Sequence, residues 1–459
     1  MSGHLRQSCN HNEWAVAKDL SAFSIPIRFL VTGRRGSFLA EIGKLQANEK
    51  SNQEAEMKKG KSFGEVKFLF VLVLAAFFMG SVWATPAHAA EKPIKIGVVL
   101  ARTGPFASLV AYILDGMKLS FDEAGNKVAG KTFEVVYEDE GPGDPAFVMD
   151  KLRKLVESDK VEIVIGPFNS DLRLATLAYT SKKKIPSFAV VCDDEGALKF
   201  PYAYAFNQTT FQEARPVGWY AFDQLKVKTV NAIGGDWHAG HAFIEGFAQG
   251  FTKERKGKVI SQQFPPIGTT DFSSYIVAMK PADALVLMSV PGDVAAFLSQ
   301  AHQMGALKNT KVINIGQSIL PPMLKDLGPK LIGNTWQHAE YQPFYKGAAN
   351  KKFNELYQAK FGHPAGSFEG SGYAAGLVVL EALRITNGDT DPDKIHEAVK
   401  SIKMDTPLGK LSFVPGNADK SGVEGILSRF IEVIKQGKDG YYWDLAYEYP
   451  EVKPAPIMK

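Results

Sequence analysis

Hydrophobic and polar positions around residues 161–194 alternate in the way expected of a strand–helix–strand unit. Residues 161–165 and 187–191 are short apolar runs, and apolar positions recur at helical spacing between them, at Leu172, Ala175, Leu177 and Ala178. Short apolar runs flanked by turn residues predict buried strands, and the 3.6-residue period predicts a helix. Two parallel strands joined by a helix form a βαβ unit.

Each predicted strand of this unit ends in a polar tip. Asn169-Ser170-Asp171 follows the first strand, and Cys192-Asp193-Asp194 follows the second. Ligands of open α/β sheets bind beyond the carboxyl ends of the strands. The helix that begins near Ser170 directs free N–H groups and its positive dipole end toward the tip, which favours a carboxylate. The sequence therefore predicts one wall of a small-anion cleft.

The same alternation continues on both sides of this unit and predicts two α/β lobes. The first lobe contains strands 94–100 and 132–138 and helices 107–123 and 146–158. The second contains strands 230–234, 259–263, 284–289 and 312–315 and helices 241–254, 272–279 and 294–304. The irregular segment 334–345 predicts a return crossing, followed by helices at 351–361, 373–386 and 392–403 and by antiparallel strands at 406–413 and 430–434. Strict alternation implies mostly parallel sheets that are covered on both faces.

Residues 57–89 have the pattern of a secretory signal peptide. Lysines precede the apolar run 68–79, and the small-x-small site Ala87-His88-Ala89 follows it. The alternative is a membrane anchor, but this run is short for a span. We expect translation from Met57, cleavage after Ala89 and export to the periplasm. Residues 1–56 are interpreted as a wrongly assigned extension. The cleavage site has no cysteine to carry a lipid, so we do not expect a lipoprotein.

Composition and charge exclude nucleic acid as a partner. The chain is 45% hydrophobic and 22% charged, which is typical of globular domains. Its net charge of +4 comes from residues 1–90, with 11 Lys/Arg and 7 Asp/Glu, which leaves 42 of each sign elsewhere. No basic stripe of the kind that binds phosphate backbones remains. Cleavage would leave Cys192 as the only cysteine, so no internal disulfide is expected.

Several short motifs of residues 91–450 occur in the order of a known family. They are Lys95-Ile96-Gly97, Thr103-Gly104-Pro105, Ile163-Val164-Ile165-Gly166-Pro167, Ile185-Pro186, Asp271-Phe272-Ser273 and Gln303-Met304-Gly305. The chain resembles the periplasmic substrate-binding proteins of branched-chain (hydrophobic) amino acid and amide ABC transporters, the leucine-binding-like group. The resemblance implies a type I, Venus-flytrap fold, no catalysis, no cofactor, and a membrane permease with its ATPases as partners.

The family fold implies three crossings between the lobes. We place them near Gln208, Trp336 and Met404. Lobe 1 is then 90–208 with 337–403, lobe 2 is 209–336 with 404–450, and 451–459 is a tail. A hinged clamshell of this kind closes around its ligand. We expect the protein to act as a monomer.

The family's ligand contacts map onto this sequence residue by residue. Ser170 stands where the family has the serine that binds the ligand carboxylate, and Val191-Cys192-Asp193 replaces its small-small-Thr segment. Gln317 stands where the acid that pairs with the ligand ammonium is expected. Leu109 and Ala239 replace two tyrosines, and Phe368 is retained. The predicted site therefore comprises Ser170, Asn169, Val191, Cys192, Asp193, Leu109, Trp237, His238, Ala239, Val290, Gln317 and Phe368.

Several of these side chains have a structural alternative. Ser170 could cap its helix, Asp193 could be a solvated loop acid, and Trp237 could cover the hinge. His238 and His241 are three residues apart, but no third metal ligand is evident, so no metal is expected. The aromatic residues Phe211, Phe243, Phe247 and Phe251 have the helical spacing of core positions.

The function hypotheses differ in class. Uptake of a small ligand is favoured, and a ligand-sensing clamshell for a membrane receptor is the second possibility. The acidic pairs Asp139-Glu140 and Asp193-Asp194 have no nucleophile or phosphate loop nearby, which argues against an enzyme.

Gln317 decides the ligand hypothesis, because it cannot neutralise an ammonium in a dry cleft. We therefore predict a ligand with a carboxylate or amide and no α-ammonium, such as an aromatic or branched carboxylic acid. A branched-chain amino acid is the alternative, with Asp193 as the partner of its ammonium.

Overall fold

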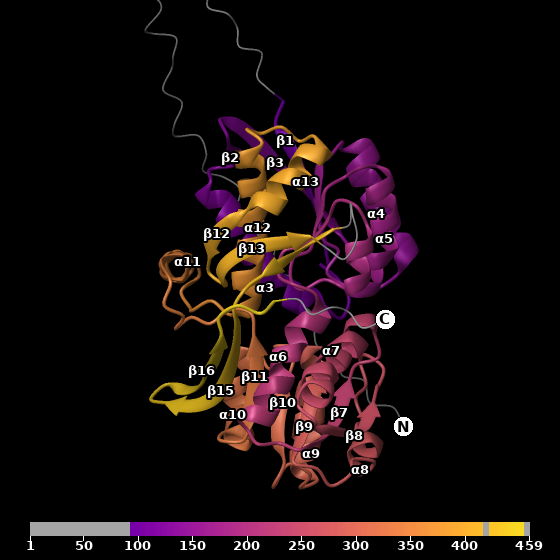
Figure 1. The fold of residues 1–459 in the computed structure, drawn as a ribbon, viewed down its shortest axis with the longest axis vertical. Helices are drawn as coiled ribbons and strands as arrows, with labels where there is room; N and C mark the ends of the chain where they lie inside the picture. The colour runs from indigo at the N-terminus through magenta and orange to yellow at the C-terminus, as the bar shows by residue number, and fades with distance from the viewer. Residues whose placement is uncertain (1–91, 416–421, 454–459) are drawn as a thin grey trace, which may run out of the picture. The chain divides into compact units, whose positions relative to one another are not determined.

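The computed structural model describes residues 92–415 and 422–453, which fall within one unit of the chain, Ala90–Lys459. These residues form two β-sheets with helices around each (Figure 1). The predicted signal peptide and the segment 1–56 lie outside the described residues.

The first sheet has nine strands in the order β12-β13-β14-β6-β5-β4-β1-β3-β2. Its central strands from β14 to β3 are parallel, and β12, β13 and β2 add antiparallel pairs at the margins. The strands are β1 Ile94–Leu100, β2 Lys127–Val128, β3 Lys131–Asp139, β4 Ile163–Ile165, β5 Ser187–Phe188, β6 Ala203–Ala205, β12 Lys403–Thr406, β13 Gly409–Pro415 and β14 Val423–Ile426.

The second sheet has seven strands in the order β16-β15-β11-β10-β9-β7-β8. The strands from β11 to β8 are parallel, and β15 and β16 form an antiparallel hairpin on β11. They are β7 Thr229–Gly234, β8 Lys258–Gln263, β9 Ala284–Met288, β10 Lys311–Asn314, β11 Thr335–Ala339, β15 Arg429–Gly437 and β16 Gly440–Tyr449.

Helices cover both sheets, as the alternation of strands and helices predicts. They are α3 Ala107–Glu123, α4 Pro145–Arg153, α5 Ser170–Lys182, α6 Thr210–Asp223, α7 His238–Ala248, α8 Ser273–Val277, α9 Pro291–Gln303, α10 Leu324–Leu331, α11 Ala348–Phe361, α12 Ser367–Ile385 and α13 Pro392–Ser401. The long helices predicted at 146–158 and 241–254 each end in a π-helical turn, Lys154–Ser158 and Gln249–Lys253. Short 3-10 helices occupy Glu195–Lys199 and Pro321–Met323.

Distant parts of the chain share each lobe. The indigo and orange segments of Figure 1 lie together around the first sheet, where α12 packs against α3. A Cβ at Gly116 of α3 would lie only 1.9 Å from the Glu369 carbonyl oxygen of α12, so this close approach requires glycine. The predicted two-lobed α/β fold is confirmed.

The three crossings are present, but the third lies later than predicted. The first runs between β6 and α6 at Gln208, as predicted, and the second follows β11 at Ala339, three residues after Trp336. The placement of the third near Met404 is wrong, because β12 to β14 belong to the first sheet and the chain crosses between Ile426 and Arg429. These three strands stay in the first sheet because β14 pairs in parallel with β6, with Val423 opposite Tyr204. Such long-range pairing has no local sequence signal.

Two predicted elements also differ from the structure. The strand predicted at 187–191 leaves the ladder after Phe188, although the chain stays buried through Val191, because residues 189–194 turn to form part of a cavity. Helix α6 was not predicted; it carries Pro216 in its interior and buries the polar residues Glu213 and Arg215 beside apolar ones.

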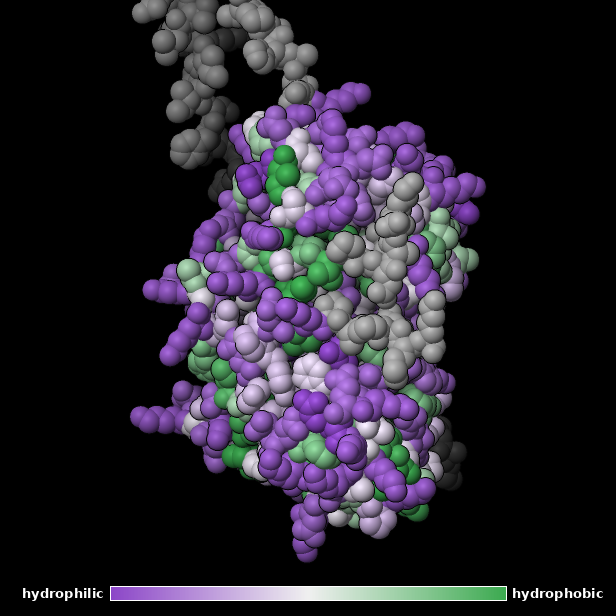
Figure 2. All heavy atoms as spheres, viewed as in Figure 1, coloured by the Kyte–Doolittle hydropathy of each residue, from purple (hydrophilic) through white to green (hydrophobic). Residues whose placement is uncertain are grey.

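The surface in view is mostly hydrophilic, and its hydrophobic side chains occur in small separate groups (Figure 2). Within 92–415 and 422–453, no helix has the length and apolarity to cross a membrane.

Candidate functional site

A cavity lies where the carboxyl ends of strands from both sheets meet, as the topology predicts. The first lobe contributes the segments after β4 and β5, and the second contributes the segments after β7, β9 and β10. The lining residues are Phe106, Leu109, Pro167–Ser170, Arg173, Ala189–Asp194, Thr210, Trp237, Ala239, Phe243, Met288–Val290, Gly316–Ser318, Glu340 and Phe368.

All the predicted site residues except His238 line this cavity. His238 lies beside the cavity, where its Nε2 pairs with Asp194 Oδ2, and its predicted contact with a ligand stays a prediction. His241 has an acidic partner of its own, Asp236 Oδ1 at 2.9 Å. The two rings therefore face separate acids. For the other residues the structure gives the location, and their contact with a ligand stays a prediction.

Glycine at position 166 sets the course of the chain into this site. Gly166 follows β4 with φ +96°, and a Cβ there would lie 2.1 Å from the Val99 carbonyl oxygen. The chain can therefore turn close under β1 and present residues 167–170 to the cavity.

Ser170 reaches across the cleft and does not cap its helix. The N-cap of α5 is Asn169, whose side chain accepts a hydrogen bond from the Asp171 N–H. The Ser170 hydroxyl instead accepts the backbone N–H of Ala239, in α7 of the second lobe, at 3.1 Å. The capping alternative for Ser170 is therefore wrong, and its oxygen joins the N-termini of α5 and α7.

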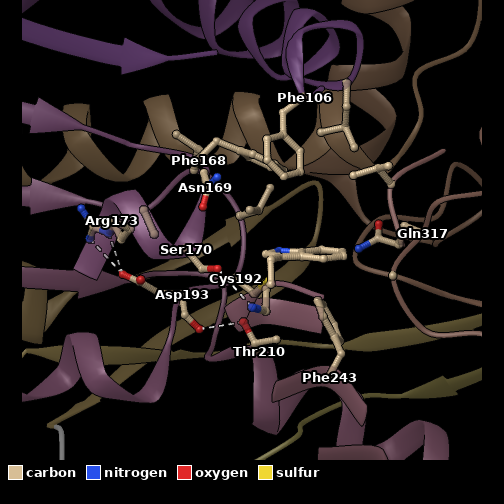
Figure 3. A pocket seen from close by; sticks show the side chains of 18 of the residues that line it. Phe106, Phe168, Asn169, Ser170, Arg173, Cys192, Asp193, Thr210, Phe243 and Gln317 are labelled. Atoms are coloured by element: carbon tan, nitrogen blue, oxygen red, sulfur yellow. Dashed lines mark hydrogen bonds and ion pairs between the residues drawn. The ribbon is translucent and has the colours of Figure 1, made fainter. Parts of the chain in front are cut away.

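Asp193 is held in a buried ion pair that the sequence did not predict. Arg173 of α5 donates to Asp193 Oδ2 from Nε at 3.0 Å and from Nη2 at 2.9 Å, and both side chains are only 2% exposed. Figure 3 shows this pair. The remaining guanidinium N–H groups bind the Gly166 carbonyl and Ser187. Asp193 is therefore neither a solvated loop acid nor a charge without a partner.

Aromatic rings line the cavity. The ring centroid of Phe106 lies 5.4 Å from that of Phe168 and 6.3 Å from that of Trp237, so rings of both lobes meet across the cleft. Phe106 and Phe168 were not predicted. Phe247 and Phe251 stack in the core, as predicted, but Phe243 of the same helix also lines the cavity.

Gln317 enters from the second lobe with its amide pointing into the cavity (Figure 3). It is buried in a left-handed backbone conformation, φ +55°, which is uncommon for glutamine. Its Oε1 accepts the Glu340 backbone N–H at 3.3 Å. Such conformations persist where the surroundings impose them, and they cluster at ligand sites.

Glu340 is a third acid of the cavity, beside Asp193 and Asp194, and sequence reasoning missed it. It follows β11 at the second crossing, and only 1% of it is exposed. Asn207 Nδ2 and Ser371 Oγ both donate hydrogen bonds to its Oε2. No local pattern could have found it, because its partners come from positions 133 and 31 residues away.

Burial shifts the titration of other groups around the site. It raises the pKa of Glu140 to about 7, although the N–H groups of Phe168 and Asn169, which bind the Glu140 carboxylate, act in the opposite direction. Burial also raises the pKa of the Cys192 thiol well above its usual value, and the charges of Glu213 and Glu340 act in the same direction. Cys192 is thus held as a thiol, unlike an activated nucleophile.

Comparison with known proteins agrees with this geometry. The family model described as periplasmic binding protein matches residues 93–429. A protein of Brucella suis biovar 1 (strain 1330), named Leu/Ile/Val-binding protein homolog 6, is 26% identical over 395 residues, which cover 84% of this chain and 99% of that protein.

Solved structures of transport proteins are also similar. An ABC transporter substrate-binding protein from Sphaerobacter thermophilus superposes with a TM-score of 0.72 at 24% identity and covers 79% of this chain and 99% of its own. A solute-binding protein of an ABC transporter from Rhodopseudomonas palustris BisB5, solved with 3,4-dihydroxybenzoic acid, gives 0.71 at 25% identity, with coverage of 79% and 99%.

Proposed function

The chain belongs to the periplasmic binding protein family, and on that premise we propose that it is the solute-binding component of an ABC importer. It captures a small carboxylate-bearing ligand with an apolar body between its lobes and delivers it to a membrane permease driven by ATPases. The family is one of substrate-binding transport proteins and not an enzyme family.

The observation that carries this proposal is the convergence of two helix N-termini on an aromatic-lined cavity. The first turns of α5 and α7 meet at the Ser170 hydroxyl and the Ala239 N–H. N–H groups and positive dipole ends at one point favour a carboxylate. The rings of Phe106, Phe168 and Trp237 beside it suit an apolar ligand body.

The ion pair of Asp193 favours an aromatic or branched carboxylic acid as the ligand. Arg173 already neutralises the acid that was expected to replace the family's ammonium partner. The Rhodopseudomonas relative, solved with a dihydroxybenzoic acid, supports this ligand class.

Uptake of a branched-chain amino acid is the second candidate. It is favoured by Glu340, an acidic residue that lines the cavity and whose backbone N–H binds Gln317. The Brucella relative is named Leu/Ile/Val-binding protein homolog 6, which supports a branched-chain amino acid as the ligand.

We further propose that the protein acts in the periplasm as a monomer. The signal pattern of residues 57–89 supports export, because it precedes the binding fold directly.

A thermal-shift screen tests the function. The panel sets leucine, isoleucine, valine and phenylalanine against benzoate, hydroxybenzoates, cinnamates and branched 2-oxo acids. Ligand at a hundredfold its dissociation constant stabilises the folded protein by about 2.7 kcal/mol. For a protein of this size we expect the midpoint to rise by roughly a few degrees for at least one acid. A panel without any shift would contradict the proposal.

A further inference from the structure

A second cavity lies beside the first and shares two wall residues with it. Gln317 and Phe368, which are only 5% and 7% exposed, line both cavities. We propose that the two cavities form one ligand site, in which the second receives the uncharged, apolar tail of a monocarboxylic acid whose carboxylate binds at the N-termini of α5 and α7. The inference rests on the proposed function and narrows its ligand to an elongated acid.

Four segments of the chain pass from the wall of one cavity to the wall of the other. In α3, Leu109 lines the first cavity, and Tyr112, one helical turn later, lines the second. Neighbouring residues do the same in the other three segments, which contribute Ser318 and Ile319 after β10, Glu340 and Tyr341 after β11, and Phe368 and Glu369 in α12. The cavities are therefore adjacent, and the Gln317 and Phe368 side chains form the partition that a ligand has to pass.

Both lobes contribute to the second cavity, as they do to the first. The first lobe supplies Tyr112 and the segment His363–Glu369. The second lobe supplies Ile319–Pro322 and, from the hairpin of β15 and β16, Tyr441–Trp443. Closure of the lobes around the carboxylate therefore encloses the tail as well.

The sizes of the two cavities indicate that the ligand uses both. The first has a volume of about 70 Å³ and the second of about 450 Å³. Ligand sites typically measure about 300–1,000 Å³. The first cavity alone is far below this range, and the second lies within it. The first can therefore hold the carboxylate end of a ligand, while a longer apolar body needs the second.

The wall of the second cavity consists mainly of aromatic, aliphatic and proline side chains. The hydrogen-bonding groups of two of its rings are already bound within the protein. Trp443 Nε1 donates to the Ile319 carbonyl at 3.0 Å, and the Tyr341 hydroxyl donates to Asn354 Oδ1 at 2.5 Å. What these rings add to the wall is apolar surface, which suits a hydrocarbon tail.

The charges of the second cavity favour a tail without a charge. Within the described residues that line it there is no lysine or arginine, and its histidine, His363, is exposed. Burial raises the pKa of Glu432 to about 8, although the hydrogen bond from Gln337 acts in the opposite direction. Burial also raises the pKa of Glu369, so both acids favour their uncharged forms. A charge of either sign at the end of the tail would lose its hydration without gaining a counter-ion.

Calorimetric titration with straight-chain acids tests the inference. Each CH2 group buried in an apolar cavity raises affinity by about fourfold, so octanoate is expected to bind at least about tenfold more tightly than butanoate. Octanedioate and 8-aminooctanoate carry a charge at the far end and should bind at least about tenfold more weakly than octanoate.

The outcomes of this titration separate the inference from the proposed function. The inference alone would be overturned if octanoate bound no more tightly than butanoate or benzoate, or if either charged analogue bound as tightly as octanoate. If neither these acids nor benzoate binds, the proposed function falls with it.

Leu320→Trp tests the second cavity within the protein. Leu320 is half-buried and lines the second cavity but not the first, so an indole there fills space that the tail needs. The affinity for octanoate is expected to fall at least about tenfold, and the affinity for butanoate much less. Leu114→Trp is the matched control and should keep both affinities, because Leu114 is also a half-buried leucine packed against the same core but lies in a groove outside both cavities.

Two results for Leu320→Trp would contradict the proposal. One is an affinity for octanoate equal to that of the control, and the other is an equal loss of affinity for octanoate and butanoate. If this variant does not fold, the series of acids with the wild-type protein decides the question.

Discussion

Replacing Arg173 with methionine is expected to lower the free energy of unfolding by about 3–5 kcal/mol, because it leaves the Asp193 carboxylate buried without its cation. Arg173 and Asp193 are both 2% exposed. The same change removes the hydrogen bonds of the guanidinium to the Gly166 carbonyl and to Ser187. The loop of residues 167–170 lies directly after Gly166, so ligand affinity should fall as well.

Urea unfolding followed by circular dichroism measures this effect. The matched control is Arg153→Met in α4, whose pair with Asp150 is exposed, at 56% and 77% of the two side chains. Exposed pairs of this kind contribute about 0–1 kcal/mol. The double variant Arg173→Met/Asp193→Asn should recover part of the loss, because no unpaired charge remains. A loss for Arg173→Met no larger than that of the control would show that the buried pair does not hold the site.

Replacing Ala239 with tryptophan is expected to weaken ligand binding at least about tenfold while the lobes stay folded. Ala239 lines the cavity from α7, and its N–H donates to the Ser170 hydroxyl of the other lobe. An indole at this position fills space that the ligand needs and keeps the lobes apart. Overpacking typically costs about 1–3 kcal/mol, which corresponds to about five- to 150-fold in affinity, and a side chain as large as an indole should lie in the upper part of this range.

The control for this variant is Ala242→Trp, on the same helix. Ala242 is also half-buried, but it lies in a groove outside the cavity. Calorimetric titration should give wild-type affinity for Ala242→Trp and a strongly reduced affinity for Ala239→Trp. Equal affinities of the two variants would place the ligand elsewhere.

The regular elements could be predicted from the sequence because local periodicity determines them. Strand β1 and helix α3 agree with the prediction to the residue, since one is a continuous apolar run and the other a clear 3.6-residue stripe. Helix α6 was missed because its buried face includes Glu213 and Arg215, which pair with residues of distant segments. These buried charges and Pro216 within the helix obscured the apolar stripe that includes Ala214, Val217 and Tyr220.

The position of the third crossing could not be predicted for a different reason. The hairpin of β12 and β13 has the same sequence pattern whichever sheet it joins. Its place in the first sheet depends on the pairing of β14 with β6, between residues more than 200 positions apart, such as Val423 and Tyr204. Such a choice is made by packing, and no local signal carries it.

The candidate site was predictable in outline but not in chemistry. The polar tips after β4 and β5 could be found because parallel strands end at one edge. The charges could not, because the partners of Asp193 and Glu340 are set by the folded chain. Arg173 appears in sequence as one basic residue of a predicted helix, and Glu340 as one acid in an irregular segment. Their pairing therefore changes the ligand argument that the sequence alone supported.

Capture of a small acid by closure of two lobes is the central claim, and small-angle X-ray scattering tests it most directly. The contacts that join the lobes in this structure include Ser170 with Ala239, Asp194 with His238, and Phe106 with Trp237. A ligand that binds between the lobes shifts the population toward this closed form. With the tightest-binding acid of the panel at saturation, the radius of gyration should be smaller than that of the empty protein. An unchanged radius at saturation would contradict the account.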